Sequence, residues 1–254
     1  LTFPRGNRGA STRRIDALAA AAAAAYVRDF GPHLTWVYLQ YPDDVGHHFG
    51  EGDEMAEAVR LADAQIGGIW DAVQQRAERA DEDWLVVVTT DHGRREDGFG
   101  HGGQSDRERR TWIVTNAADT NAYFETTPAM VDILPTIARF MGIAIPKNVA
   151  MELDGVPFIG DIAASNFVAT RDGSDALRLR WKAWTREGRA RVWLATTNAY
   201  REGGLDTYRL VGEVEVAAEE ATIPLNGLAG DFFKVVLETP DGRYLNYWIV
   251  EAGQ

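Results

Sequence analysis

The chain has 254 residues, of which 45% are hydrophobic and 25% are charged, and its net charge is −12 at pH 7. These values are typical of a soluble globular protein with room for one large domain or two of ordinary size. The acidic balance excludes an extended nucleic-acid partner, because such a surface needs clustered basic residues. The absence of cysteine excludes disulfides and thiolate zinc sites. No apolar run is long enough to cross a bilayer.

The first part of the chain alternates between helical and strand patterns. Apolar residues at helical spacing predict helices over residues 12–30, 54–79 and 131–142, with Asp132 as an N-cap. Short apolar runs bounded by turn residues predict buried strands over residues 34–40, 83–90 and 111–115. This order predicts an α/β domain over residues 1–162, with a parallel sheet and flanking helices.

The last ninety residues have a different pattern. Leu177, Leu179 and Trp181 alternate with charged residues, and residues 240–242 form a turn signal between two further apolar runs. Short alternating strands of this kind predict a small all-β sandwich of the fibronectin III/Ig type over residues 165–254. This part has no histidine and no acidic cluster, so we expect it to serve packing, surface attachment or glycan contact.

Aspartates and histidines gather at three points in the first part. Two aspartates and two histidines lie within "YPDDVGHHFG", where spacing alone allows either Asp43 with His47 or Asp44 with His48. Asp91 and His92 follow the second predicted strand, and His101 lies in a glycine-rich loop shortly after it. Ligand sites of parallel α/β sheets form beyond the carboxyl ends of the strands, where the first two of these points are expected.

Imidazole and carboxylate side chains together favour zinc, manganese or iron. Each point taken alone also fits a turn aspartate and a surface histidine, so the hypothesis of a metal site depends on their occurring together. His33 is expected at the surface. The arginines of the following loop could clamp a phosphate, but their acidic neighbours favour a solvated loop; they are Arg94, Arg95, Arg107, Arg109 and Arg110.

These motifs resemble the type I phosphodiesterase/nucleotide pyrophosphatase branch of the alkaline phosphatase superfamily. That branch has Asp-x-x-Gly-His-x-x-Gly after one strand, Thr-Asp-His-Gly after a later one, and a further histidine downstream. The chain reads DDVGHHFG at 43–50, TDHG at 90–93 and GHG at 100–102. "VDILPTIARFMGI" followed by "LDGVPF" also resembles the family, so the similarity covers about the first 160 residues.

The resemblance implies a two-metal hydrolase of phosphate esters, of the phosphodiester or nucleotide pyrophosphate type. Asp43, His47 and His101 would bind the first metal and Asp91 and His92 the second, both most simply zinc. The glycine pattern of the family selects the register of Asp43 and His47, which leaves Asp44 and His48 as supporting or surface residues. In the family a Thr or Ser attacks phosphorus and forms a covalent phospho-enzyme intermediate.

The family's nucleophile and a further aspartate ligand lie upstream of the first motif. Ser11 and Thr12 have no preceding strand and no aspartate ligand nearby, so neither is expected to be the nucleophile. We therefore expect a missing N-terminal segment of the same protein as a partner, no nucleophile within this chain, one tightly bound metal at most and little turnover. The substrate is expected to be a small phosphate ester.

Other functions remain open on the sequence. A sulfatase would use carboxylates and a modified Cys or Ser, which the histidines do not favour. A phosphomonoesterase of the same superfamily is an alternative, whereas a phosphoglycerate or phosphopentose mutase of that superfamily fits the glycine spacing around His47 and the appended β domain less well. A non-catalytic protein with a vestigial metal cluster and a binding sandwich is a further alternative. Family habit implies export to the periplasm or the cell exterior.

Overall fold

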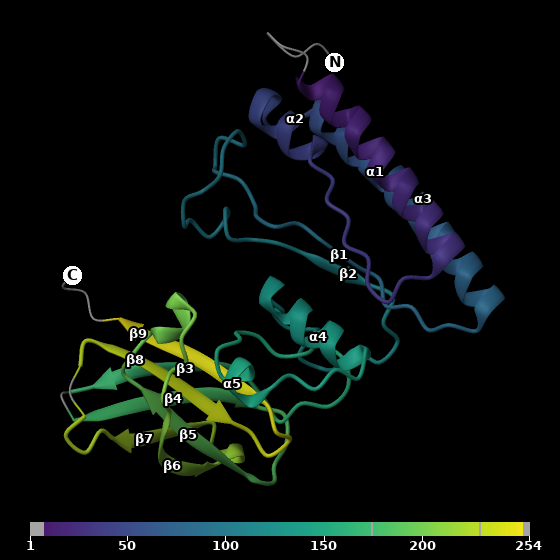
Figure 1. Cartoon of the computed structure of the whole chain (residues 1–254). Helices are drawn as coiled ribbons and strands as arrows, with labels where there is room; N and C mark the ends of the chain where they lie inside the picture. The colour runs from purple at the N-terminus through teal and green to yellow at the C-terminus, as the bar shows by residue number, and fades with distance from the viewer. Residues whose placement is uncertain (1–7, 174, 229, 251–254) are drawn as a thin grey trace. The chain divides into compact units, whose positions relative to one another are not determined.

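The computed structural model describes residues 8–173, 175–228 and 230–250 (Figure 1). The chain divides into two compact units, residues 1–112 and 113–254, each with its own packed interior. The predicted boundary at residues 162–165 corresponds to the start of the first sandwich strand, β3 at Ala164. The fifty residues before that strand group with the sandwich in the second unit. The terminal residues 1–7 and 251–254 of the predicted domains lie outside the described residues.

Three helices make up most of the first unit: α1 (Arg8–Phe30), α2 (Tyr41–Phe49) and α3 (Asp53–Ala80). The helices predicted over 12–30 and 54–79 are confirmed as α1 and α3. Val27 of α1 packs on Ala72 and Val73 of α3. Within the described residues, no helix is both long enough and apolar enough to cross a membrane.

Helix α2 was not predicted, because its nine residues were interpreted as a loop after a strand. Pro42 stands in its first turn, where proline is tolerated, and Gly50 ends it with φ +69°. Val45 is fully buried against α3. The buried carboxylate of Asp16 in α1 accepts a hydrogen bond from the backbone N–H of Tyr41 at 2.7 Å. This contact satisfies a free donor at the start of α2 and fixes the helix to α1.

The predicted strands are shorter than expected or absent. Residues 34–40 are irregular, and Trp36 is 80% exposed, so the prediction of a buried strand there is wrong. Of residues 83–90 only β1 (Val87–Thr89) is a strand, and of 111–115 only β2 (Ile113–Thr115). A strand forms only where a neighbouring segment completes its hydrogen-bond ladder, and an apolar run does not say whether that neighbour exists.

The second unit begins with β2 and a short helical region: η1 (Met130–Asp132), α4 (Ile133–Phe140) and α5 (Lys147–Ala150). Its α4 helix confirms the core of the helix predicted over 131–142. Asp132 does not cap it, because its backbone is already helical. Its buried carboxylate instead accepts hydrogen bonds from the Tyr123 hydroxyl, at 2.7 Å, and from the backbone N–H groups of Ala129 and Val156.

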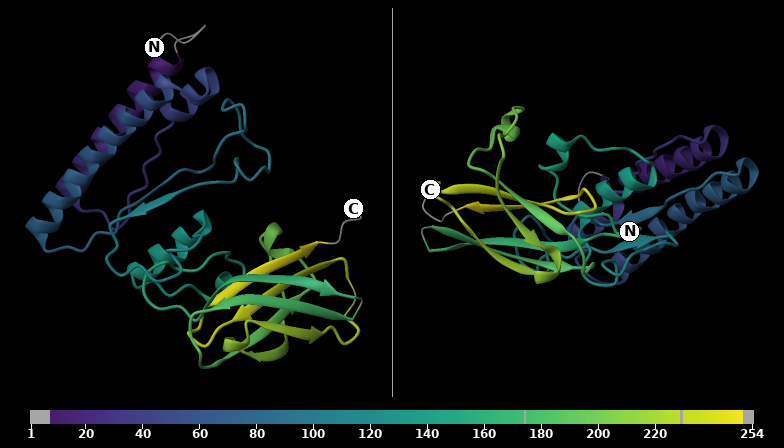
Figure 2. Two further views of the ribbon diagram at one scale, coloured as in Figure 1. Left: turned by 180° about the vertical axis from the view of Figure 1, so that it is seen from behind. Right: turned by 90° about the horizontal axis from the view of Figure 1, so that it is seen from below.

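The β-sandwich predicted for the last ninety residues is confirmed (Figure 2). One sheet has the order β3-β4-β7 and the other β6-β5-β8-β9, with antiparallel neighbours throughout. The strands are β3 (Ala164–Asp172), β4 (Ala176–Ala183), β5 (Arg189–Ala195), β6 (Arg209–Glu215), β7 (Glu220–Pro224), β8 (Phe232–Glu238) and β9 (Tyr244–Val250). Leu177, Leu179 and Trp181 are buried as predicted, and the turn at 240–242 joins β8 to β9.

Strand β8 is buried on both faces, which the alternating pattern did not predict. Its Lys234 is completely buried, and the ammonium group lies 2.5 Å from Glu152 Oε2 and 2.8 Å from Asp206 Oδ2. Tyr208 donates a further hydrogen bond to Glu152 Oε1 at 2.7 Å. Glu152 follows α5, and Asp206 follows a short 3₁₀ helix, η2 (Ala199–Glu202). The ion cluster therefore holds the segment after α5 and the segment after η2 against the outer face of β8.

Candidate metal centre

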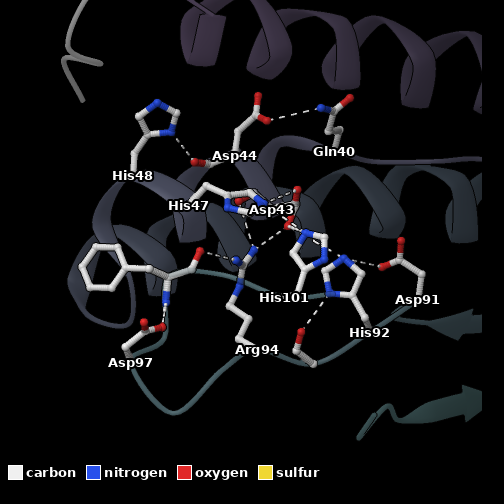
Figure 3. Close-up of polar contacts among 12 residues, drawn as sticks. Gln40, Asp43, Asp44, His47, His48, Asp91, His92, Arg94, Asp97 and His101 are labelled. Carbon is white, nitrogen blue, oxygen red and sulfur yellow. Dashed lines mark hydrogen bonds and ion pairs between the residues drawn. The ribbon is translucent and has the colours of Figure 1, made fainter. Parts of the chain in front are cut away.

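Helix α2 presents Asp43 and His47 on one face, because residues four apart in a helix are neighbours. His47 Nε2 lies 3.5 Å from Asp43 Oδ2 and 3.0 Å from His101 Nε2 (Figure 3). His101 belongs to the glycine-rich loop, more than fifty residues along the chain. The fold thus brings the first and third sequence motifs into direct contact.

The second motif joins the same group. His92 Nε2 lies 3.9 Å from Asp43 Oδ1 and 3.6 Å from Asp91 Oδ1. The His92 and His101 rings stack, with centroids 3.7 Å apart and planes 19° from parallel. His101 Nε2 is 3.6 Å from Asp43 Oδ1. Asp43 is thereby at the centre of three imidazoles, and Asp91 lies at the edge of the group with 60% of its side chain exposed.

Asp44 and His48 lie outside this cluster. Asp44 accepts a hydrogen bond from the Gln40 side chain at 3.2 Å, and His48 Nδ1 is 2.7 Å from the Asp44 carbonyl oxygen. Figure 3 shows both side chains directed away from His92 and His101. The geometry therefore favours the register of Asp43 and His47, although their role as metal ligands stays a prediction.

Arg94 is a member of the site that the sequence did not reveal. Its guanidinium group donates to Asp43 Oδ1 at 2.7 Å and to the Asp43 carbonyl oxygen at 3.0 Å, and only 12% of its side chain is exposed. The expectation of a solvated arginine is therefore wrong for Arg94. It holds for Arg95 and Arg109, which pair with acidic neighbours at the surface. Arg94 fixes the orientation of the Asp43 carboxylate.

Two motif glycines make this arrangement possible. A Cβ atom on Gly46 would lie 2.1 Å from the Arg94 guanidinium carbon, and one on Gly93 would lie 2.1 Å from the Arg107 carbonyl oxygen. Any larger residue would displace Arg94 at the first position or the backbone at the second. The absence of a side chain at Gly46 was the one sequence signal that could have indicated a close neighbour there.

The loop after His101 is held by Glu108. Its buried carboxylate accepts hydrogen bonds from the Gly103 N–H at 2.8 Å and from the Ser105 hydroxyl at 2.6 Å. The hydrogen bond from Ser105 and that from Gly103 hold the pKa of Glu108 below its usual value. The Gly93 N–H donates to the Glu108 carbonyl oxygen at 2.7 Å. Glu108 thus connects the loop that carries His101 to the residue after His92.

Contacts around His92 and His101 bear on how their rings could bind a metal ion. His92 Nδ1 is 2.8 Å from the Gly93 carbonyl oxygen, so this nitrogen carries the proton and leaves the Nε2 lone pair facing Asp43. Burial, the nearby His92 and His47 rings and the Arg94 charge lower the pKa of His101, and they outweigh the opposite effect of Asp43. A neutral imidazole is the form that binds a metal ion.

The spacing of these atoms fits a single cation. Ligand atoms about 2.0–2.1 Å from a tetrahedral zinc ion are about 3.3 Å from one another. His47 Nε2 is 3.5 Å from Asp43 Oδ2 and 3.0 Å from His101 Nε2, whereas His101 Nε2 is 3.6 Å from the other carboxylate oxygen, Asp43 Oδ1. Nitrogen and oxygen atoms of Asp43, His92 and His101 also lie within 4.8 Å of one another. Among the described residues, the donor atoms of this last set are the ones that all lie close together, whereas His47 approaches the other oxygen of Asp43, so its role as a ligand of the first metal stays a prediction.

Comparison with solved structures concerns the sandwich. The fibronectin III domains of human collagen alpha-1(XX) chain and human contactin 1 align with 37% of the chain and with 89% and 82% of their own lengths. Sequence identities are 18% and 8%, and TM-scores are 0.29 and 0.25.

Comparison with known sequences concerns the part with the metal-site residues. Residues 6–96 match the model of the family type I phosphodiesterase/nucleotide pyrophosphatase. GPI ethanolamine phosphate transferase 3 of Eremothecium gossypii is 34% identical over 122 residues, and GPI ethanolamine phosphate transferase 2 of Saccharomyces cerevisiae is 29% identical over 129. Each match covers 42% of this chain but only 11% and 15% of the relatives. Residues 6–96 are thus similar to the type I phosphodiesterase/nucleotide pyrophosphatase family, and the two relatives belong to the same alkaline phosphatase-like superfamily.

Proposed function

We propose that Asp43, His47 and His101 bind a divalent metal ion, most simply zinc, in an enzyme that acts on phosphate esters. Manganese and iron also suit these ligands. The observation that carries the proposal is the convergence of three separate motifs on the Asp43 carboxylate. The family match over residues 6–96 supports a phosphoester as the substrate class.

A bound cation would supply positive charge to the phosphate oxygens and lower the pKa of a hydroxyl group beside it. The residues of this chain would prepare that position. Arg94 keeps one Asp43 oxygen engaged and so aims the other toward His47. With 41% of its side chain exposed, His47 leaves the cluster open to a small substrate from solvent. Asp91 and His92 would hold a second ion, in keeping with in-line displacement between two cations.

The acceptor of the phosphoryl group distinguishes two forms of this function. Hydrolysis through a phospho-Thr or phospho-Ser intermediate corresponds to the family as a whole, with a nucleophile that we assign to no residue of this chain. Transfer to an alcohol is the second candidate, favoured by the two relatives named as ethanolamine phosphate transferases. Hydrolysis and transfer would both use the Asp43 cluster. Export of the protein to the periplasm or the cell exterior stays a prediction.

Calorimetric titration with zinc tests the metal site. We expect one tight site per chain, which His47→Ala or His101→Ala abolishes. His48→Ala is the matched control and should bind zinc like the unmodified chain, because His48 contacts the Asp44 backbone instead of the cluster. Loss of zinc binding in His48→Ala but not in His47→Ala would overturn the register.

The substrate class needs a separate measurement. A non-hydrolysable phosphodiester analogue should bind the zinc-loaded chain and should not bind after chelation or in His101→Ala. Binding that is indifferent to zinc would refute the proposed function. Rapid hydrolysis of a nitrophenyl phosphodiester by this chain would instead show that it contains its own nucleophile.

A further inference from the structure

A cavity of about 320 Å³ lies in the second unit, between the α4–α5 region and the β8–β9 turn. Apolar side chains make up much of its wall: Pro135, Ile143, Ile145, Leu153, Val156 and Pro157. Arg139 of α4 and Arg243, just before β9, line the same space. Cavities of this size and mixed character are typical of small-molecule sites.

The two guanidinium groups are incompletely neutralised. Arg139 Nη1 donates to the backbone carbonyl of Asp161 at 2.7 Å, a contact that provides no counter-charge. Arg243 Nε lies 3.3 Å from Asp241 Oδ2, but it is buried without a directed hydrogen bond among the described residues. Asp241 also accepts a hydrogen bond from the Thr239 hydroxyl at 2.5 Å. Asp241 is the one carboxylate among the residues that line the cavity, which include both arginines.

Glu238 lies beside the lining residue Tyr244, but its charge is already engaged. The Glu238 carboxylate is already paired with Arg191 at 2.5 Å and with Lys147 at 3.8 Å. The hydroxyl of Tyr244, which lines the cavity, donates to the same carboxylate at 3.1 Å. Burial, and then the charge of Arg139, lower the pKa of Arg243. The charged side chains that line the cavity are two arginines and one aspartate, a net positive set in a chain whose net charge is −12.

We propose that this cavity binds a small organic anion, in which a carboxylate or phosphate group contacts Arg139 and Arg243 and a short hydrocarbon group packs on Ile143, Ile145 and Leu153. Guanidinium groups suit this task because their planar N–H donors match the oxygens of both kinds of anion. An anion there would give the Arg243 Nε–H a partner and would reduce the repulsion between the two arginines. The apolar wall would select an anion with a hydrocarbon chain over a bare inorganic one.

The test is a titration of the full chain with butyl phosphate, hexanoate and inorganic phosphate in turn. NMR or calorimetry measures the dissociation constant of each anion. A chelator is present throughout, so that the Asp43 cluster holds no metal and the outcome is independent of the proposed phosphoesterase. We expect the organic anions to bind at least tenfold more tightly than inorganic phosphate. The comparison of butyl phosphate with hexanoate identifies the preferred head group.

Variants locate the binding. Arg243→Gln and Arg139→Gln should each weaken it at least tenfold, whereas Arg178→Gln on the exposed face of β4 should not change it. Ala144 lines the cavity and is exposed in an irregular segment, so Ala144→Trp should occupy part of the cavity and abolish binding with both arginines intact, even if Arg243→Gln unfolds. Undiminished binding in Ala144→Trp, no binding by the unmodified chain, or equal affinity for inorganic phosphate would overturn the proposal.

Discussion

Arg94 and Arg95 are neighbours in the chain, yet their guanidinium groups have different surroundings. Arg94 is largely buried and makes a charge-assisted hydrogen bond of 2.7 Å to the carboxylate of Asp43. Arg95 has 55% of its side chain exposed and pairs with Asp97 at 3.2 Å. A buried, directed bond restrains the carboxylate that it contacts, whereas an exposed ion pair contributes little.

Replacement of Arg94 should therefore weaken zinc binding without removing a ligand. We expect Arg94→Ala to lower the zinc affinity about 10–100-fold, the effect typical of losing a residue that orients a metal ligand. Arg95→Ala is the control and should leave the affinity unchanged. Calorimetric titration of both variants measures the difference, and equal affinities would show that Arg94 has no positioning role.

At the scale of single residues, the sequence predicted the members of the Asp/His cluster but not their support. Asp43, His47, His92 and His101 stand in motifs whose residue types indicate metal binding. Arg94 stands in a loop of alternating charges, where a buried arginine and a solvated one have the same local pattern. Arg94 is the buried one because its guanidinium group contacts Asp43 in α2, a residue far upstream in the chain that the local pattern does not reveal.

Among the elements, β8 shows how a buried charge can join segments. Lys234 on this strand contacts Glu152 and Asp206, from two segments that have no backbone pairing with it. Removal of one partner from a buried ion pair leaves an uncompensated charge, at a cost of about 3–5 kcal/mol. Lys234→Met should lower the free energy of unfolding of the second unit by about that amount.

Lys182→Met is the matched control, because Lys182 also pairs with a carboxylate, that of Glu219 at 2.8 Å, but is half exposed. Its effect should stay within about 1 kcal/mol. Urea unfolding followed by tryptophan fluorescence measures both variants. If Lys234→Met lowers the free energy of unfolding no more than Lys182→Met does, the buried ion cluster does not stabilise the second unit as proposed.

The ion cluster around Lys234 should also make the free energy of unfolding depend on pH in the acidic range. Burial alone would raise the pKa of Asp206, but the hydrogen bonds from Lys234, Thr197 and the backbone outweigh it and hold the pKa below its usual value. The resulting stabilisation is complete above about pH 4, the pKa of an unfolded aspartate, and is lost as the pH falls toward the lower folded value. Lys234→Met should reduce this acid dependence of the urea midpoint, while the hydrogen bonds from Thr197 and the backbone N–H groups of Ala199 and Tyr200 remain.

The elements predicted correctly were those with a long internal pattern. α1 and α3 have many helical turns, and the sandwich strands alternate clearly. α2 was missed because it has only nine residues, although the four-residue spacing from Asp43 to His47 and the early Pro42 are both compatible with a helix. Residues 34–40 were assigned to a strand from composition, which cannot reveal whether a pairing neighbour is present.

For the whole molecule, the division into two units predicts two unfolding transitions. Zinc at about one hundred times its dissociation constant should stabilise only the unit with the Asp43 cluster, by about 2.7 kcal/mol. Differential scanning calorimetry with and without zinc measures the shift, and His101→Ala should abolish it. A single transition, or a shift of both transitions, would contradict the independence of the units.

The position of Glu152 has a practical consequence for isolating the sandwich. A fragment that begins at Ser165 would contain Lys234 but not Glu152, so a completely buried ammonium group would lose one of its two carboxylates. The outer face of β8 would lose the chain that covers it. A fragment that begins at Ile113 would retain both. A segment that the sequence assigns to the preceding α/β domain therefore supplies, through Glu152, a buried counter-charge that the sandwich needs.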